Sequence, residues 1–215
     1  MKAITIEDIR QEHLSTIHTL IDEIWDWSSF IRNEETLKAT LSLYLDEVLR
    51  ESSFGKVALA NDQIIGVIFG RAETAYPHYK LLVNESLENV LALLKATNAE
   101  QRDIQAVLSG LDQSYRSLIQ GREHIYHGSL NLFAVSESAQ GLGIGKLLWE
   151  ELQAYFIREG SSKIYVYTDS DCNYGFYDYH GFEQVSRIEL NCQLMETTWA
   201  ADIFLYEYKI LLSNE

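Results

Sequence analysis

The chain has 215 residues, of which 47% are hydrophobic, and it carries a formal net charge of −15. This composition can supply a packed core and excludes an intrinsically disordered chain. The negative charge disfavours nucleic acid and anionic membranes as partners, because both repel an acidic protein. The N-terminus lacks the apolar core of a signal peptide, and no apolar run approaches the roughly 18 residues of a membrane span. We therefore expect a cytoplasmic protein.

Cysteine content and chain length further limit the class of protein. Cys172 and Cys192 are the only cysteines, and with the six histidines they form no metal-binding spacing. We expect two reduced thiols and no metal site. The length fits one domain over residues 1–215, with room for an insertion.

The first third of the chain predicts a strand, two helices and a hairpin. A short strand at Ala3–Ile6 is followed by helical spacing of apolar residues from Glu7 to about Ile24. Asn33 is the expected N-cap of a second helix. That helix covers about Glu34–Arg50. The two strands of the hairpin cover Lys56–Ala60 and Gln63–Arg71.

Residues 73–127 predict two or three helices between strands. Apolar residues recur at helical period from Val83 to Thr97. Asn98 with Gln101 resembles a capping box that opens another helix, and Gly110 is its expected end. A further apolar stretch follows before the next strand.

The last third alternates strands and helices. The predicted strands are Leu130–Val135, Lys163–Thr168, Glu183–Leu190 and about Ala200–Tyr208, and the predicted helices are Gly143 to about Ile157 and Asn173–His180. Leu147, Leu148 and Leu152 are expected in the core. Together the elements predict a mixed α+β fold with about seven strands and helices on both faces of the sheet.

The stretch AQGLGIGKLL, Ala139 to Leu148, places three glycines at the start of a helix. A P-loop requires glycine at position 140 and serine or threonine at 147, where the chain has Gln140 and Leu147. A dinucleotide fingerprint fails because Lys146 stands where its third glycine belongs. The remaining pattern is Gln140-x-x-Gly143-x-Gly145. Such a turn either binds an anion through bare backbone N–H groups or is only a tight connection that binds nothing.

This pattern resembles the phosphate-binding turn of the GNAT family of N-acetyltransferases, which joins that family's fourth strand to its third helix. A second stretch supports the resemblance. TDSDCNYGFYDYHGF, Thr168 to Phe182, places Phe176-Tyr177 and Gly181-Phe182 after a strand, as the family does. The segment 73–127 departs from the minimal family pattern, in which the third and fourth strands are joined directly.

The resemblance implies acetyl-CoA as cosubstrate and a set of cofactor contacts. Backbone groups of the turn would hold the pyrophosphate, and Lys146 could add a charged contact to it. Backbone groups of the fourth strand would bind the pantetheine arm where the fourth and fifth strands part. Asn173 would either cap its helix or touch the cofactor. The implied cofactor-binding residues are Phe133, Ala134, Val135, Gln140, Gly141, Leu142, Gly143, Ile144, Gly145, Lys146 and Asn173.

The implied reaction is direct attack of a primary amine on the acetyl thioester in a ternary complex. Tyr177 matches the family position of the acid that protonates the leaving thiolate, since a phenol is about as acidic as a thiol of that kind. It could also be an ordinary packed aromatic residue. The expected acceptor is a small molecule of unidentified structure. The alternative is a non-catalytic module of the same fold that binds CoA as a sensor or interaction domain.

Four further assignments remain, of which three stay open. The candidates for deprotonating the amine, directly or through water, are His127, Glu123, Glu73 and His78, with Asn131 as a residue that would hold such a water. Asp169 and Asp171 are interpreted as turn residues. The aromatic residues near Trp25 and Trp27 either form an acceptor wall or only pack helices together. The insertion at 73–127 would cover the acceptor end of the site or build a contact in a homodimer.

Overall fold

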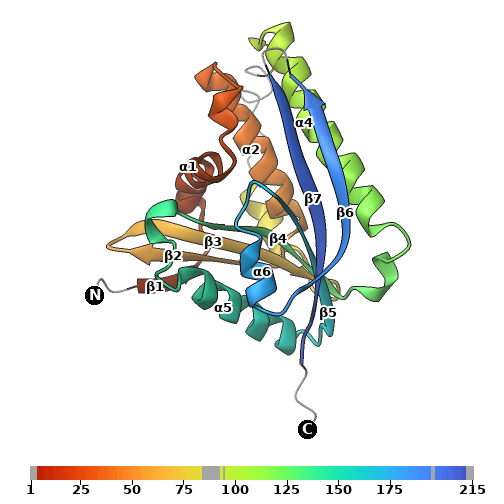
Figure 1. The fold of residues 1–215 in the computed structure, drawn as a ribbon. Coiled ribbons are helices and arrows are strands. Elements are labelled where there is room, and N and C mark those ends of the chain that lie inside the picture. The colour runs from red at the N-terminus through yellow and green to blue at the C-terminus, as the bar shows by residue number, and fades with distance from the viewer. Residues whose placement is uncertain (1–3, 84–92, 94, 195–196, 212–215) are drawn as a thin grey trace.

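The computed structural model describes residues 4–83, 93, 95–194 and 197–211. In this part of the chain, seven strands form one mixed sheet in the order β1-β2-β3-β4-β5-β7-β6, with helices on both faces (Figure 1). This confirms the expected fold class. The strands are β1 (Ile4–Asp8), β2 (Phe54–Ala60), β3 (Gln63–Ala72), β4 (Gly128–Val135), β5 (Lys163–Asp169), β6 (Glu183–Gln193) and β7 (Thr198–Lys209). The helices are α1 (Leu14–Trp25), α2 (Glu34–Glu51), α4 (Asn98–Ile119), α5 (Ile144–Arg158) and α6 (Gly175–Tyr179).

Each face of the sheet has its own hydrophobic core, covered by different helices. Helices α1 and α2 pack on one face of β2, β3 and β4, around Val57, Val67 and Phe69. Helix α5 packs on the opposite face, where Leu148 and Leu152 are fully buried. Helix α4 lies along β6 and β7 (Figure 1). No helix within the described residues is long and apolar enough to cross a membrane.

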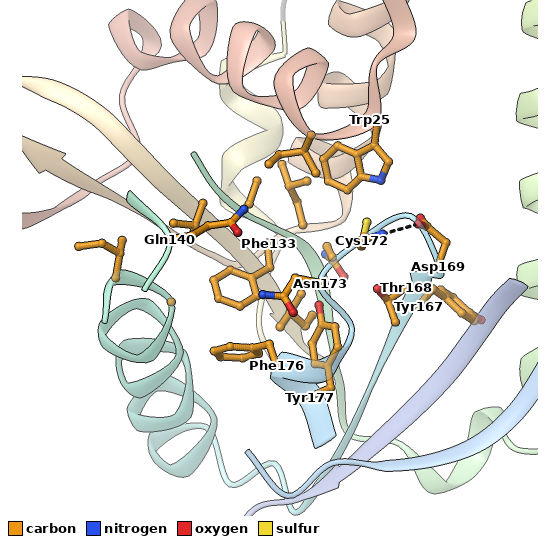
Figure 2. A pocket seen from close by; sticks show the side chains of 18 of the residues that line it. Trp25, Phe133, Gln140, Tyr167, Thr168, Asp169, Cys172, Asn173, Phe176 and Tyr177 are labelled. Carbon is orange, nitrogen blue, oxygen red and sulfur yellow. Dashed lines mark hydrogen bonds between the residues drawn. The ribbon is translucent and has the colours of Figure 1, made fainter. Parts of the chain in front are cut away.

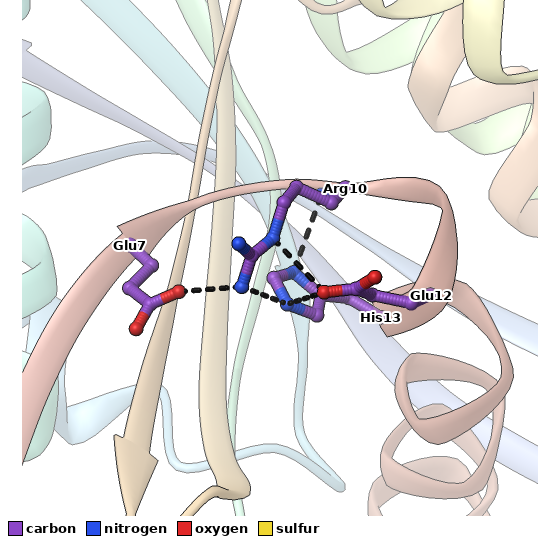
Figure 3. Close-up of polar contacts among 4 residues, drawn as sticks. All are labelled: Glu7, Arg10, Glu12 and His13. Carbon is purple, nitrogen blue, oxygen red and sulfur yellow. Dashed lines mark hydrogen bonds and ion pairs between the residues drawn. The ribbon is translucent and has the colours of Figure 1, made fainter.

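The first helix begins seven residues later than Glu7, its expected start. Glu7 and Asp8 instead pair with β2, so β1 extends through Asp8. A short 3-10 turn, Gln11–His13, then precedes α1. Arg10 holds this connection in place, since its guanidinium contacts the carboxylates of Glu7 and Glu12, and its backbone N–H donates to Nδ1 of His13 at 3.2 Å (Figure 3). Strand pairing and this polar cluster override the helical spacing.

Among the described residues of the insertion, where the sequence predicted two or three helices, α4 is one continuous helix from Asn98 to Ile119. Thr97 is the N-cap of α4 and forms a capping box with Glu100, so the expected Asn98–Gln101 box was one residue out of register. The helix runs through Gly110 without ending. A Cβ at Gly110 would lie 2.8 Å from Leu190 Cδ1, so the glycine lets α4 approach β6 closely. The helix expected at Val83–Thr97 falls mostly on residues 84–92 and 94, outside the described residues.

Most other predicted elements are confirmed within a few residues. Asn33 caps α2 by accepting a hydrogen bond from the Thr36 N–H at 2.9 Å. The hairpin turns at Asn61 and Asp62, both with positive φ. The prediction that Leu147 lies in the core is wrong, because its side chain is 40% exposed while Leu148 and Leu152 are buried. It lies on α5 one position outside the stripe that faces the sheet.

Strands β4 and β5 pair in parallel over only three residues and then part. The pairing runs from Gly128 to Leu130 of β4, opposite Ile164 to Val166 of β5, although both strands continue beyond it. At the same point β4 carries a bulge. Phe69 of β3 pairs with Leu132 and Gly70 pairs with Leu130, which leaves Asn131 as the extra residue. A bulge bends a strand and redirects its side chains, and here it coincides with the end of β4–β5 pairing.

The side chain of Asn131 holds the bulge to its neighbours. Its Nδ2 donates to Ser52 Oγ at 3.0 Å, and its Oδ1 accepts from Ser129 Oγ at 2.6 Å. Ser52 is fully buried at the end of α2. The amide therefore connects the point where the sheet opens to the helix that covers it.

We predict that Asn131→Ala destabilises the fold by roughly 1–3 kcal/mol, because buried hydroxyl groups lose their partners. Urea denaturation measures the change. Asn191→Ala is the matched control, since Asn191 makes an exposed hydrogen bond to Glu189. Equal effects of the two substitutions would show that Asn131 does not hold the bulge.

His18 on α1 gives the fold an acid-sensitive contribution to stability. Burial, reinforced by the nearby charge of Lys38, lowers the pKa of His18 to about 4. The unfolded chain binds this proton near pH 6.5. The contribution to stability is therefore complete above about pH 6.5 and is lost as the pH falls towards 4.

We predict that His18→Gln reduces the difference in unfolding free energy between pH 7.5 and pH 5. Urea denaturation at both pH values, on the wild type and the variant, measures that difference. Other titrating groups contribute to both proteins and cancel in the comparison. An unchanged difference would contradict a lowered His18 pKa.

Candidate active site

A cavity of about 780 Å³ opens where β4 and β5 part. Its walls come from the end of α1, from α2, from the separated ends of β4 and β5, from the start of α5 and from α6. Figure 2 shows side chains from these elements gathered around one space, with Phe133 and Tyr177 near its centre and Trp25 at its far side. The bulge at Asn131 and the end of strand pairing thus create the opening in which the site lies.

The glycine turn forms one end of this cavity. Gly141 and Gly143 have φ of 75° and 80°, a left-handed conformation that other L-residues adopt at a cost of roughly 1–2 kcal/mol. A Cβ at either position would meet no atom within 4 Å. Gly143 is the N-cap of α5, so the free N–H groups of the first helical turn start here. The space around the turn and the helix dipole together suit an anionic group.

Gly145 has a different role from the other two glycines. A Cβ at this position would lie 3.2 Å from Phe176 Cε2 and 3.4 Å from Phe133 Cζ. The rings of Phe133 and Phe176 pack edge to face with centroids 5.0 Å apart. Gly145 therefore allows the start of α5 to sit directly on this aromatic pair. The turn is thereby fixed relative to β4 and α6.

Tyr177 brings a buried phenol to the same cavity. Its side chain is 6% exposed and contacts the rings of Phe176, Phe182 and Tyr206. Burial, and then the nearby ionisable groups of Cys172 and Asp169, raises the pKa of Tyr177 well above its ordinary value. The phenol is therefore fully protonated at neutral pH and able to donate. Its hydroxyl points into the cavity in Figure 2.

Comparison with known proteins identifies the family. The acetyltransferase (GNAT) family model matches residues 17–182, which include both the glycine turn and Tyr177. The chain belongs to the GNAT family of acetyltransferases. A search of curated protein sequences finds no significant match.

Solved structures with the same fold have low sequence identity to this GNAT protein. An N-acetyltransferase from Staphylococcus aureus Mu50 has a TM-score of 0.56 at 13% identity, covering 97% of this chain and 99% of its own. PaiA N-acetyltransferase from Thermoplasma acidophilum, solved with coenzyme A, has a TM-score of 0.53 at 16% identity and coverages of 96% and 99%. YncA from Salmonella typhimurium, solved with acetyl-CoA, has a TM-score of 0.52 at 13% identity and coverages of 97% and 95%. At these identities the likeness concerns the fold.

The structure brings almost all of the predicted site residues of this GNAT protein together. Those that line the cavity are Phe133, Ala134, Val135, Gln140, Gly141, Gly143, Ile144, Gly145, Lys146, Asn173 and Tyr177. Leu142 is the exception, because its side chain is 65% exposed and lies outside the cavity lining. The Lys146 side chain is largely exposed, so its ammonium group is accessible at the mouth of the cavity. Its Nζ lies 3.8 Å from Glu150 Oε1.

Two roles were expected for Asn173, and the first of them, capping its helix, is wrong. Helix α6 begins at Gly175 with Tyr174 at the N-cap position and without a side-chain cap. The Asn173 side chain instead lies beside Phe133 and Tyr177 in the cavity (Figure 2). The other role expected for Asn173, a contact with the cofactor, stays a prediction.

Asp169 lines the cavity, which the sequence interpretation as a turn residue did not foresee. Its Oδ1 does accept the N–H groups of Asp171 and Cys172, at 2.9 and 3.0 Å, so the turn is real. Its side chain is also 7% exposed, and burial raises its pKa. The usable signal in the sequence was its place at the end of the strand that parts from β4, together with the thiol of Cys172 beside it. Burial and the adjacent Asp169 raise the pKa of that thiol, so it stays protonated.

None of the four expected candidates for a base lies in the cavity lining, whereas Asn131, the expected water holder, does. Both polar groups of its amide are engaged by Ser52 and Ser129. Glu73, His78, Glu123 and His127 are exposed and lie outside that lining. The acidic and imidazole side chains that do line the cavity come from other segments than expected, and they are Glu47, Glu51, Glu137, Asp169, Asp171 and His180.

Proposed function

We propose that this GNAT protein transfers the acetyl group of acetyl-CoA to the primary amine of a small-molecule acceptor, by direct attack within a ternary complex. The observation that carries the proposal is the convergence of the glycine turn and the Tyr177 phenol on one cavity between parted strands. One end of the cavity suits an anion and the centre offers a proton donor. An acyl-CoA presents a pyrophosphate and a thioester at separate points along one extended molecule.

The residues present fit acetyl-CoA along its length. The N–H groups of Gly141 and of Gly143 to Lys146 would hold the pyrophosphate, whereas the Leu142 N–H already donates to the Ala139 carbonyl; the Lys146 ammonium group would add charge at the mouth. Beyond Leu130, β4 pairs with no described strand on its β5 side, so those backbone groups of Phe133 to Val135 that do not pair with β3 would bind an extended amide-containing arm. The Phe133 and Phe176 rings would pack against that arm.

The chemistry then follows from what surrounds the thioester. Acetyl-CoA supplies a carbonyl carbon that the neutral amine nitrogen attacks, so that a C–N bond forms and the C–S bond breaks. Tyr177 donates its phenolic proton to the departing sulfur and regains a proton from solvent. The acceptor nitrogen loses two protons as its ammonium group becomes an amide: one balances the proton that ends on the CoA sulfur, and the other is released to solvent. Holding both reactants in one cavity makes the reaction effectively intramolecular, which supplies much of the rate.

We predict that acetyl-CoA at 100 times its Kd raises the unfolding free energy of the wild type by about 2.7 kcal/mol. Gly143→Glu should abolish this stabilisation, because it places a carboxylate where the pyrophosphate would bind. A thermal shift assay with cofactor-free protein measures both.

Gly160→Glu is the matched control for this substitution. Gly160 follows the opposite end of α5, has a φ of 70°, and has no atom within 4 Å of a Cβ position. It carries the same backbone strain away from the cavity, so its response to acetyl-CoA should be that of the wild type. If millimolar acetyl-CoA gives no shift in the wild type, the acetyltransferase proposal fails.

We predict that Tyr177→Phe lowers kcat by roughly 100-fold or more, the usual contribution of a positioned acid. The variant should still give the acetyl-CoA thermal shift, since the ring and its packing are kept. Tyr174→Phe, on the same segment but outside the cavity lining, should leave kcat unchanged. Release of free CoA thiol with a panel of primary amines measures the rate. A shift with acetyl-CoA but no turnover with any amine would instead favour a CoA-binding sensor.

A further inference from the structure

A second cavity of about 500 Å³ adjoins the first. The two cavities share six lining residues, which are Ile24, Trp25, Tyr44, Tyr115, Asp169 and Asp171. We call this second cavity the aromatic chamber. It lies between the end of α1, helix α2, helix α4 and the start of β7. A molecule in the chamber would therefore reach the parted strands from the side opposite the glycine turn.

Six of the sixteen residues that line the chamber are aromatic. Trp25 and Trp27 flank Tyr44, with ring centroids 6.2 and 5.8 Å from it. Trp199 of β7 closes another side, and its indole N–H donates to Asp171 Oδ2 at 2.9 Å. Tyr115 of α4 completes the wall towards β5, stacked on Tyr167 at 4.3 Å. Rings held this rigidly present flat apolar surfaces, which suit an apolar body or the methylene groups beside an ammonium group.

Helix α4 supplies the remaining apolar wall. Val107 and Leu111 line the chamber together with Tyr115, all from one side of α4. The close approach of α4 to β6 at Gly110 sets the distance of these side chains from the sheet. The insertion therefore supplies one wall of the chamber.

The charges of the chamber all have one sign. Asp26, Asp169 and Asp171 line it, and none of the described lining residues is Lys, Arg or His. Asp169 is the buried member of the three and also lines the first cavity, so it stands at the boundary between the two. Its electrostatic influence reaches Tyr177, which places both groups around the same region. A cation in the chamber would settle beside Asp169, next to the reaction centre.

We propose that the aromatic chamber binds the acceptor, and that the acceptor is a primary amine on an apolar or aromatic body without a carboxylate. This inference rests on the proposed acetyltransferase function. The ammonium group pairs with Asp169 at the boundary, and the apolar body fills the space between Trp25, Trp199 and Leu111. An amino acid is disfavoured because its carboxylate would face the three aspartates.

The substrate test compares three amines with acetyl-CoA as donor. 2-Phenylethylamine carries both features, ethylamine keeps only the ammonium group, and phenylalanine adds a carboxylate to the first compound. We expect kcat/KM for 2-phenylethylamine to exceed that for ethylamine on the order of 100-fold, from burial of the ring. It should exceed that for phenylalanine by at least about 10-fold, from charge repulsion.

Two substitutions on α4 locate the binding. Leu111→Trp fills the chamber and should reduce kcat/KM for 2-phenylethylamine by about 10-fold or more while sparing ethylamine, because burial of the ring is the interaction lost. Leu108→Trp is the matched control, since Leu108 is 38% exposed and lies outside the lining. Asp169→Asn keeps an oxygen for the turn hydrogen bonds and removes the charge. It should raise the KM for the amine and leave the KM for acetyl-CoA unchanged.

The outcomes separate this inference from the proposed function. If ethylamine or phenylalanine is acetylated as efficiently as 2-phenylethylamine, the acetyltransferase function stands and the chamber inference is overturned. It is also overturned if Leu111→Trp and Leu108→Trp have equal effects. If no amine is acetylated and acetyl-CoA gives no thermal shift, the proposed function fails and the inference falls with it.

Discussion

The parting of β4 from β5 is the constraint on which the rest of the site depends. Two parallel strands that stay paired use up their backbone groups and leave no room between them. Here the pairing ends at Leu130 and Val166, and the bulge at Asn131 turns β4 at the same point. Asn131 is held by Ser52 at the end of α2 and by Ser129 on its own strand. The opening is therefore built into the sheet and fixed by buried polar contacts.

Each functional element of the site is placed relative to this opening by packing. Gly145 has no side chain, so the start of α5 rests on Phe133 and Phe176, and the glycine turn ends up in line with the exposed edge of β4. Tyr177 is embedded among rings from α6 and β7, which keeps its phenol protonated and aimed into the gap. The glycine turn and the Tyr177 phenol thus face one cavity although they lie far apart in the chain.

The insertion between β3 and β4 distinguishes this chain from the minimal GNAT pattern. Its long helix α4 does not stand away from the domain. It packs on β6 and β7 and contributes Val107, Leu111 and Tyr115 to the aromatic chamber. Gly110 permits that contact in the middle of the helix, where a glycine would otherwise only weaken it. Helix α4 of the insertion therefore forms one wall of the aromatic chamber, which adjoins the first cavity.

Local signals in the sequence determined the element types, the glycine turn and the motif around Tyr177, because spacing, caps and turn residues act over a few neighbours. They were less able to place ends that depend on distant partners. Because β1 pairs with β2 through Asp8, α1 begins later than the apolar spacing predicts. Because α4 packs against Leu190, Gly110 lies inside the helix and does not end it. Only the tertiary structure brought Asp169 into the cavity, excluded Glu73, His78, Glu123 and His127, and joined α4 to the tryptophans of α1 and β7. Burial and charge at a site come from residues distant in the chain, and their proximity is decided by how the layers pack.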